Sequence, residues 1–201
     1  MGALSYGIRA QLPELTTINQ VTSSGCPSSL IIKQGNISDL RRACDYANAL
    51  ALSAIAKIIP EVVIIANKDN HQAMDWNNTT LKLKEMGLKQ VILVGPVPQW
   101  YSSLPLVYAK NAYGKDTLAS HKIDKNVVET NIKMVVISQS TPDFTYVDVL
   151  NNICKKKENV YGCRVIYDDV LLAWDYGHLT IEGSKFVASK YVIPAFKLPL
   201  R

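Results

Sequence analysis

Short apolar runs alternate with longer amphipathic stretches along most of the chain. Two runs, EVVIIAN and QVILVG, are continuous and bounded by polar residues or glycine, which is typical of buried strands. Helical spacing predicts a first helix over ALSYGIRAQL, which stops at Pro13. A long helix is predicted over ISDLRRACDYANALALSAIAKII, with Ser38 as its N-cap and Pro60 behind it. The next helix, AMDWNNTTLKLKEMG, is predicted to end at Gly87.

The rest of the chain continues this alternation. TTINQVTS, FTYVDVLNNI and RVIYDD are predicted as strands, and NVVETNIKMVVISQS and LTIEGSKFVASKYVIPAF as helices. Residues 96–125 are rich in Pro, Tyr and Ser, and we expect a long irregular loop there. The pattern predicts one α/β domain spanning 1–201, with a mostly parallel sheet covered by helices on both faces. In such sheets, ligands bind at the carboxyl ends of the strands.

Composition excludes several classes of protein. The chain has 201 residues, of which 48% are hydrophobic and 19% are charged, so a folded domain is expected. No apolar run approaches the roughly 18–20 residues of a membrane span, and the first residues do not resemble a signal peptide. The net charge is +5, but the lysines are scattered. The tight run Lys155–Lys157 is more typical of a solvated loop than of a nucleic-acid groove, so no nucleic-acid partner is expected.

Four cysteines, Cys26, Cys44, Cys154 and Cys163, allow three disulfide pairings. The nearest-neighbour pairing closes two local loops. The alternative is four reduced, buried cysteines in a cytosolic protein, but the polar or Gly/Pro-rich surroundings favour two disulfides. No C-x-x-C is present and there are only three histidines, so we expect neither a metal site nor another cofactor.

Candidate donors follow the predicted strands. Gly25 follows the first strand, Asn67 and Asp69 follow the second, and Gly95 follows the third. A backbone N–H at Gly25 and a side-chain amide at Asn67 are the donor types that stabilise a developing oxyanion. Each has a simpler interpretation, since Gly25 suits a turn and Asn67 suits a strand-end cap.

The stretch WDYGHLT contains the clearest candidate for catalysis. Asp175 precedes His178 by three residues, a spacing that lets the carboxylate fold back toward the ring. His178 is then a candidate general base, and Asp175 would hold its tautomer and stabilise the imidazolium. The alternative is a surface pair before a helix that Thr180 caps.

The ordered motifs resemble the SGNH/GDSL hydrolase family. The resemblance is closest to the SGNH domain fused to membrane acyltransferases (type-three family) that O-acylate bacterial surface polysaccharides. It implies a flavodoxin-like three-layer α/β/α fold, an oxyanion hole at Gly25 and Asn67, and a catalytic pair of His178 and Asp175. It also supports extracytoplasmic disulfides. The matching pieces are ALSYGIRAQLP, SSGCPSSL, the helix holding Cys44 and Asn48, VVIIAN, VILVGPVPQW, YVDVLNNIC…GC and DYGHLTIEGSKFV.

The sequence departs from the family at the nucleophile. No G-D-S occurs in it, and in register the family's serine and first strand would fall before Met1. Either the chain is a fragment of a larger protein or its ancestor lost the serine. Ser5 is a weak substitute because it lies inside a helical pattern, and Ser23 and Ser24 suit a turn. A sheet without its first strand is expected to show strand exchange, dimerisation or a disordered start. The run at Asn67, IANKD, also departs from the family's G-x-N-D.

The resemblance implies a periplasmic O-acyltransferase domain tethered to the inner membrane. A membrane acyltransferase domain would supply the acyl group, with acetyl the expected group, and a polysaccharide such as lipopolysaccharide O-antigen would accept it. The alternatives are an esterase acting on acylated carbohydrate, and a non-catalytic module binding carbohydrate or protein. Four aromatic residues in the 96–125 stretch suit either sugar stacking or an ordinary core: Trp100, Tyr101, Tyr108 and Tyr113.

Overall fold

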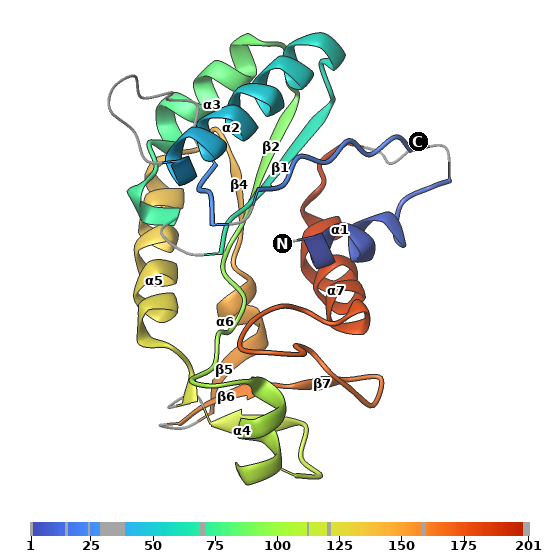
Figure 1. The fold of residues 1–201 in the computed structure, drawn as a ribbon, viewed down its shortest axis with the longest axis vertical. Coiled ribbons are helices and arrows are strands. Elements are labelled where there is room, and N and C mark those ends of the chain that lie inside the picture. The colour runs from blue at the N-terminus through green and yellow to red at the C-terminus, as the bar shows by residue number, and fades with distance from the viewer. Residues whose placement is uncertain are drawn as a thin grey trace.

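A small parallel sheet lies at the centre of the molecule (Figure 1). The computed structural model describes residues 2–14, 16–23, 25–28, 39–68, 71–111, 113–119, 122–157 and 160–198. The sheet has the order β1 (Val62–Ala66), β2 (Gln90–Val94), β4 (Thr145–Val147). Val63 lies beside Val91, and Ile92 lies beside Thr145, in parallel register. The predicted N-cap Ser38 lies outside the described residues.

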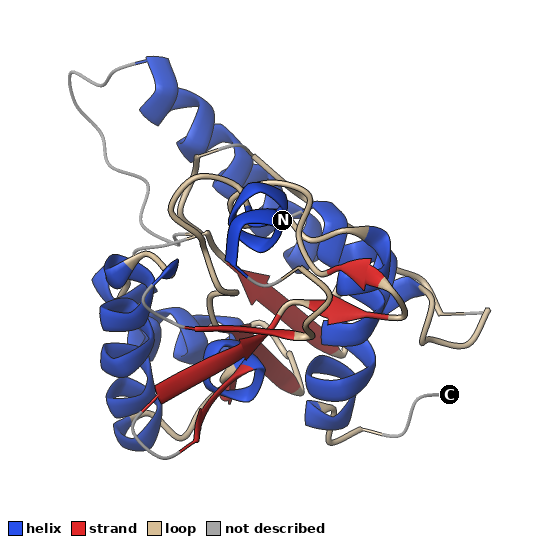
Figure 2. Ribbon diagram, turned by 90° about the horizontal axis from the view of Figure 1, so that it is seen from below, coloured by secondary structure: helices blue, strands red, loops and turns tan. Residues whose placement is uncertain are grey.

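Strand β2 separates two apolar clusters because successive side chains of a strand point to opposite faces. Val91 and Leu93 pack with α3 (Trp76–Glu85), α5 (Lys125–Ser140) and Ile55 of α2 (Asp39–Ile58). Ile92 and Val94 pack with α1 (Gly2–Arg9) and α7 (Ile181–Val187). Figure 2 shows the strands enclosed by these helices. The chain is therefore a mixed α/β protein with helices on both faces of the sheet.

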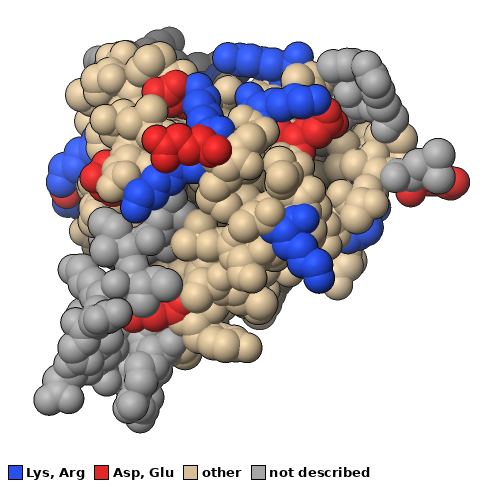
Figure 3. All heavy atoms as spheres, turned by 90° about the horizontal axis from the view of Figure 1, so that it is seen from above, with Lys and Arg blue, Asp and Glu red and all other residues tan. Residues whose placement is uncertain are grey.

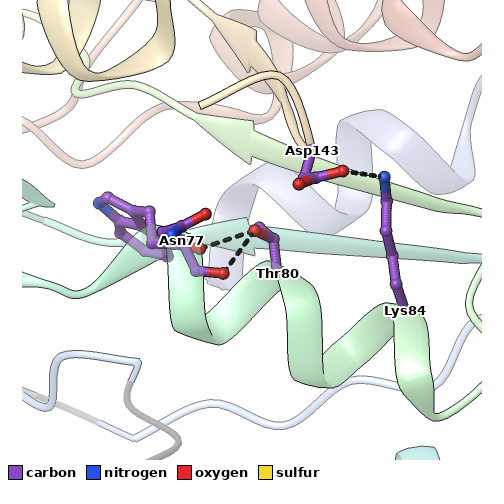
Figure 4. Close-up of polar contacts among 5 residues, drawn as sticks. Asn77, Thr80, Lys84 and Asp143 are labelled. Carbon is purple, nitrogen blue, oxygen red and sulfur yellow. Dashed lines mark hydrogen bonds and ion pairs between the residues drawn. The ribbon is translucent and has the colours of Figure 1, made fainter. Parts of the chain in front are cut away.

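Local hydrogen bonds explain where α3 begins and how it is held. The Asp75 side chain accepts the N–H of Asn78, which caps the helix. Inside the helix, the Thr80 hydroxyl contacts the carbonyls of Trp76 and Asn77, and Lys84 forms an ion pair with Asp143 before β4 (Figure 4). Both charged side chains are partly exposed, so this pair contributes at most about 1 kcal/mol.

The described residues also form a separate antiparallel sheet. It has the order β3 (Thr117–Ala119), β6 (Val160–Arg164), β5 (Cys154–Lys157), and a hairpin of β7 (Ile166–Tyr167) and β8 (Val170–Leu171) follows. Both disulfides join nearest neighbours along the chain, as expected: Cys26–Cys44 ties the 25–28 segment to α2, and Cys154–Cys163 joins opposed residues of β5 and β6.

Two predicted elements are wrong in detail. The stretch 96–125 is more regular than expected, since it contains α4 (Leu104–Asn111) and β3. Leu104 and Val107 are buried and anchor α4 in the core. FTYVDVLNNI holds the short strand β4 followed by α6 (Val149–Ile153), because the Asp148 side chain accepts the N–H of Asn151 and starts a helix.

The predicted first strand, TTINQVTS, forms no strand among the described residues 16–23. A ladder requires a neighbour about 4.8 Å away. Instead, a cavity of about 730 Å³ separates this segment from β1, and α1 and α2 also line it. Within the described residues, β1 pairs with β2 on one side, and its other edge faces this cavity.

Helical turns of changing pitch follow α7. After α7, residues Ala188–Val192 form a π-helical turn (η3) and Ile193–Ala195 a 3₁₀ turn (η4) that contains Pro194. A similar 3₁₀ turn, η1 (His71–Ala73), precedes α3. None of the helices that the structure describes combines the length and apolar character needed to cross a bilayer.

Candidate active site

The loop 174–178 folds the Asp175 carboxylate back onto its own turn. One oxygen, Oδ1, accepts the backbone N–H groups of Gly177 and His178 at 2.9 and 2.8 Å. The other oxygen, Oδ2, lies 2.6 Å from Nδ1 of His178. The D-x-x-H spacing therefore builds an acid–histidine pair whose carboxylate is already oriented by the peptide backbone.

These contacts set the charge of Asp175. Partial burial raises the pKa of its carboxyl, but the hydrogen bonds from Gly177 and His178 and the nearby imidazole lower it more, so the pKa lies below its usual value. Because Nδ1 of His178 is hydrogen-bonded to the Asp175 carboxylate, Nε2 is the ring nitrogen that can take a proton from a substrate. Nε2 has no hydrogen-bond partner among the described residues, and the side chain is 44% exposed. The ring is thus accessible to a substrate.

The segment after β2 holds this loop in place. The N–H of Trp100 donates to the carbonyl of Tyr176 at 2.7 Å, and the N–H of Leu104 donates to the carbonyl of Asp175 at 2.9 Å. Gly177 packs so closely on Gln99 that an added Cβ would lie 2.8 Å from the Gln99 side chain. The acid–histidine pair is therefore fixed against the carboxyl end of β2.

Asn67 presents an uncommitted amide at the end of β1. Its side-chain oxygen accepts the N–H and the hydroxyl of Ser28 at 3.2 and 3.0 Å. A backbone N–H can only donate, so this contact fixes which end of the amide is oxygen. The residue is 7% exposed, and its Nδ2 has no hydrogen-bond partner among the described residues. A buried donor without a partner is costly and is a common feature of functional sites.

Gly25 lies in the exposed segment that reaches Asn67 through Ser28. Its φ of +69° is the left-handed conformation that glycine adopts without strain. Contacts connect this side to the histidine: Lys68, next to Asn67, places its ammonium 5.0 Å from the Tyr176 ring, which lies 5.3 Å from the His178 ring. Residues distant in sequence are thus linked around the carboxyl ends of β1 and β2.

Several other candidates have structural roles. Gly95 leaves room for Tyr146, whose hydroxyl would lie 2.4 Å from an added Cβ. Trp100 is buried in the core, whereas Tyr101 and Tyr113 are exposed. Ser5 lies in α1 and lines the cavity beside β1. The candidates Asp69 and Ser24 lie outside the described residues.

Sequence reasoning missed Ser28, which orients the amide, and Trp174, which stacks on His178 with ring centroids 5.5 Å apart. Trp174 stands beside the D-x-x-H stretch in the sequence, but nothing in that pattern indicates stacking.

No described group of three or more His, Cys, Asp or Glu side chains is placed to hold a metal ion. On the face shown in Figure 3, basic and acidic side chains are interspersed, and no wide basic patch is seen there.

A parallel α/β sheet with an acid–histidine pair and an amide donor at its strand ends is the arrangement expected of SGNH hydrolases. The model of the SGNH domain fused to AT3 domains matches residues 1–192, and the chain belongs to this family.

The fold is similar to the periplasmic domain of a lipopolysaccharide acetyltransferase from Salmonella ser. Paratyphi A, with a TM-score of 0.70. The two are 21% identical, and the match covers 94% of this chain and 75% of that one. At this identity the likeness shows the fold alone. No curated protein matches the chain significantly.

Proposed function

We propose that this chain is the periplasmic part of a membrane O-acyltransferase that transfers an acyl group, such as acetyl, to a hydroxyl of a cell-envelope polysaccharide such as lipopolysaccharide O-antigen. The observation that carries the proposal is the Asp175–His178 pair, whose Nε2 has no hydrogen-bond partner among the described residues. The buried amide of Asn67, whose Nδ2 also has no partner there, supports it from the end of β1. The family's fusion to AT3 domains supports a membrane partner that supplies the acyl group. The two disulfides support an extracytoplasmic location.

The proposed chemistry proceeds through an acyl-serine. A serine oxygen attacks the carbonyl carbon of the acyl donor while Nε2 of His178 takes its proton, and Asp175 stabilises the imidazolium. The developing oxyanion accepts hydrogen bonds from Nδ2 of Asn67 and the N–H of Gly25. The leaving group takes the proton from His178. A sugar hydroxyl then gives its proton to Nε2 while its oxygen attacks the acyl-serine carbonyl. The bond to the serine oxygen breaks, His178 returns the proton to that oxygen, and the sugar ester is released.

The serine is proposed to lie on a segment that these 201 residues do not include. The cavity of about 730 Å³ beside β1 supports this idea, because it lies along an unpaired strand edge and next to α1. The family's first strand would pair with β1 there and complete a flavodoxin-like sheet, with its serine just before α1. In Figure 1 the beginning of α1 is turned toward the parallel sheet.

An esterase would use the same catalytic residues, because water can replace the sugar hydroxyl as the acceptor. The absence of G-D-S from the sequence favours a second candidate from another class, a non-catalytic binding module on an inherited fold. The two candidates differ in what happens when the upstream segment is present.

The test compares this chain with a longer protein that carries the family's serine segment in front of it. The 201-residue chain is expected to hydrolyse p-nitrophenyl acetate no faster than its His178→Ala variant, because the base has no hydroxyl to deprotonate. In the longer protein, His178→Ala is expected to reduce acetyl transfer to de-acylated polysaccharide by about 10⁴-fold. Asn67→Ala should reduce it by about 10²–10³-fold.

Asn77→Ala, on the exposed side of α3, is the matched control and should leave transfer unchanged. Clear His178-dependent turnover by the 201-residue chain would contradict the missing nucleophile, and Ser5→Ala would then show whether Ser5 supplies it. If the longer protein transfers acetyl groups equally well with and without His178→Ala, the binding module is favoured.

A further inference from the structure

Trp174 differs from the other tryptophans in its surroundings. The sequence has three tryptophans, and Trp76 and Trp100 are 2% and 4% exposed. Trp174 is 62% exposed, although an indole is among the most favourable side chains to bury. It lies in the same loop as the candidate base. An exposed indole at this place is more typical of a ligand contact than of the core.

The Trp174 ring is placed beside the imidazole of His178. The two rings are nearly parallel, with an interplanar angle of 20° and centroids 5.5 Å apart. One face of the indole is thus turned to the imidazole, and the high exposure of the side chain leaves the other side open to a ligand. Tyr176 contacts the imidazole from another direction, edge to face at 5.3 Å.

The backbone holds Trp174 in this position. Its N–H donates to the carbonyl of His178 at 3.0 Å, and an isolated antiparallel bridge joins Ala173 to Leu179 directly outside this pair. The base of the loop is therefore closed by main-chain hydrogen bonds. A fixed indole loses little conformational entropy when a ligand stacks on it, which favours binding.

We propose that Trp174 is the platform on which one pyranose ring of the acceptor polysaccharide stacks, so that the neighbouring sugar of the same chain presents a hydroxyl to Nε2 of His178. This inference rests on the proposed function and adds the residue that positions its acceptor. A pyranose carries C–H groups on its faces and hydroxyls around its edge. The C–H face suits the flat indole, and the edge then points to the hydrogen-bonding groups of the loop.

The chemistry of the surroundings favours a sugar over other ligands. An acyl chain needs an enclosed apolar channel, whereas Trp174 stands on the open surface next to the charged Asp175. A protein partner needs a broad interface, and a single exposed indole provides room for one ring. Lys68 and Tyr176 add polar groups at the edge of the loop that can meet sugar hydroxyls.

The position of Trp174 gives a direct binding assay on the chain as it exists. Because the other two tryptophans are buried, a saccharide that stacks on Trp174 should change the exposed part of the intrinsic fluorescence. The probes are methyl pyranosides and de-O-acylated lipopolysaccharide O-polysaccharide. Affinities come from the fluorescence titration and, for the variants, from calorimetry.

Trp174→Ala is expected to weaken binding by about 5- to 150-fold, the range that nucleobases stacked on aromatic side chains give. Trp174→Phe, which keeps an aromatic face, should retain part of the affinity while losing the fluorescence signal. Tyr46→Ala is the matched control, since Tyr46 is an exposed aromatic residue at 73% and lies on α2, outside this loop. It should bind as the unaltered chain does.

The proposal is overturned if no probe gives a saturable signal, if Trp174→Ala binds as well as the unaltered chain, or if Tyr46→Ala loses as much affinity. His178→Gln separates this idea from the proposed function, because it removes the base but leaves the indole. Saccharide binding that depends on Trp174, combined with acetyl transfer that does not depend on His178, would refute the chemistry and keep the platform. The reverse result would refute the platform alone.

Discussion

The contact between α1 and α7 makes a sharp test of how the start of α1 is positioned. Gly7 of α1 donates its N–H to the hydroxyl of Ser184 in α7 at 2.9 Å. A Cβ added at Gly7 would lie 2.1 Å from the carbonyl oxygen of Ser184. Since a carbon–oxygen contact needs about 3.3 Å, Gly7→Ala must push α1 away by roughly 1 Å.

The cost of Gly7→Ala follows from three effects. Overpacking of this kind costs about 1–3 kcal/mol, and loss of the hydrogen bond to Ser184 about 1 kcal/mol more. The better helix propensity of alanine returns about 1 kcal/mol. The net loss in the free energy of unfolding is about 2 kcal/mol, which lowers the Tm by about 4–8 °C in a domain of this size. Leu4 and Ile8, buried on the same helix, lose contact with the core if α1 moves.

Thermal and urea unfolding measure this change, and Gly162→Ala is the matched control. An added Cβ at Gly162 meets nothing within 4 Å, so that variant should stay within about 0.5 kcal/mol of the unaltered chain. Equal stability of Gly7→Ala and Gly162→Ala would refute the close packing of α1 on α7. The proposed place of the serine, just before α1, would lose its support with it.

Two further predictions concern the candidate site. Asp175→Asn should lower the free energy of unfolding at neutral pH. The difference should vanish as the pH falls below about 4, because a carboxyl whose pKa is lowered in the folded state gives stability that is lost on protonation. Urea titrations from neutral to acid pH measure this, and a difference that stays constant with pH would contradict it. The double variant Cys26→Ala/Cys44→Ala should lose about 3 kcal/mol in the free energy of unfolding, since the disulfide closes a loop with a sequence separation of 18. If the denaturation midpoint is the same with and without this disulfide, the segment around Gly25 is held by other contacts.

Continuous apolar runs and the D-x-x-H spacing were the most informative parts of the sequence. The runs around Val63 and Val91 form parallel strands, of which β2 is fully buried and β1 is only half-buried, and the Asp175 carboxylate folds onto His178 through local hydrogen bonds. Such features depend on neighbours in the chain. TTINQVTS failed because a strand requires a partner, and alternation within one segment does not show whether that partner is present.

Other features depend on contacts between distant segments. Ser28 orients the amide of Asn67 across 39 positions of sequence, and no local pattern indicates that contact. Helix α4 forms within a Pro- and Tyr-rich stretch because Leu104 and Val107 reach the core. The three-dimensional arrangement, and not the residue types alone, decides these cases.

The loop with the candidate base is anchored by the peptide groups of residues 100 and 104. Every amino acid except proline supplies the same N–H, so evolution can exchange the side chains at both positions without moving the imidazole, provided that the core still packs. A proline at either position would remove one anchor. Drift in sequence and a constant geometry of the acid–histidine pair are therefore compatible in this loop.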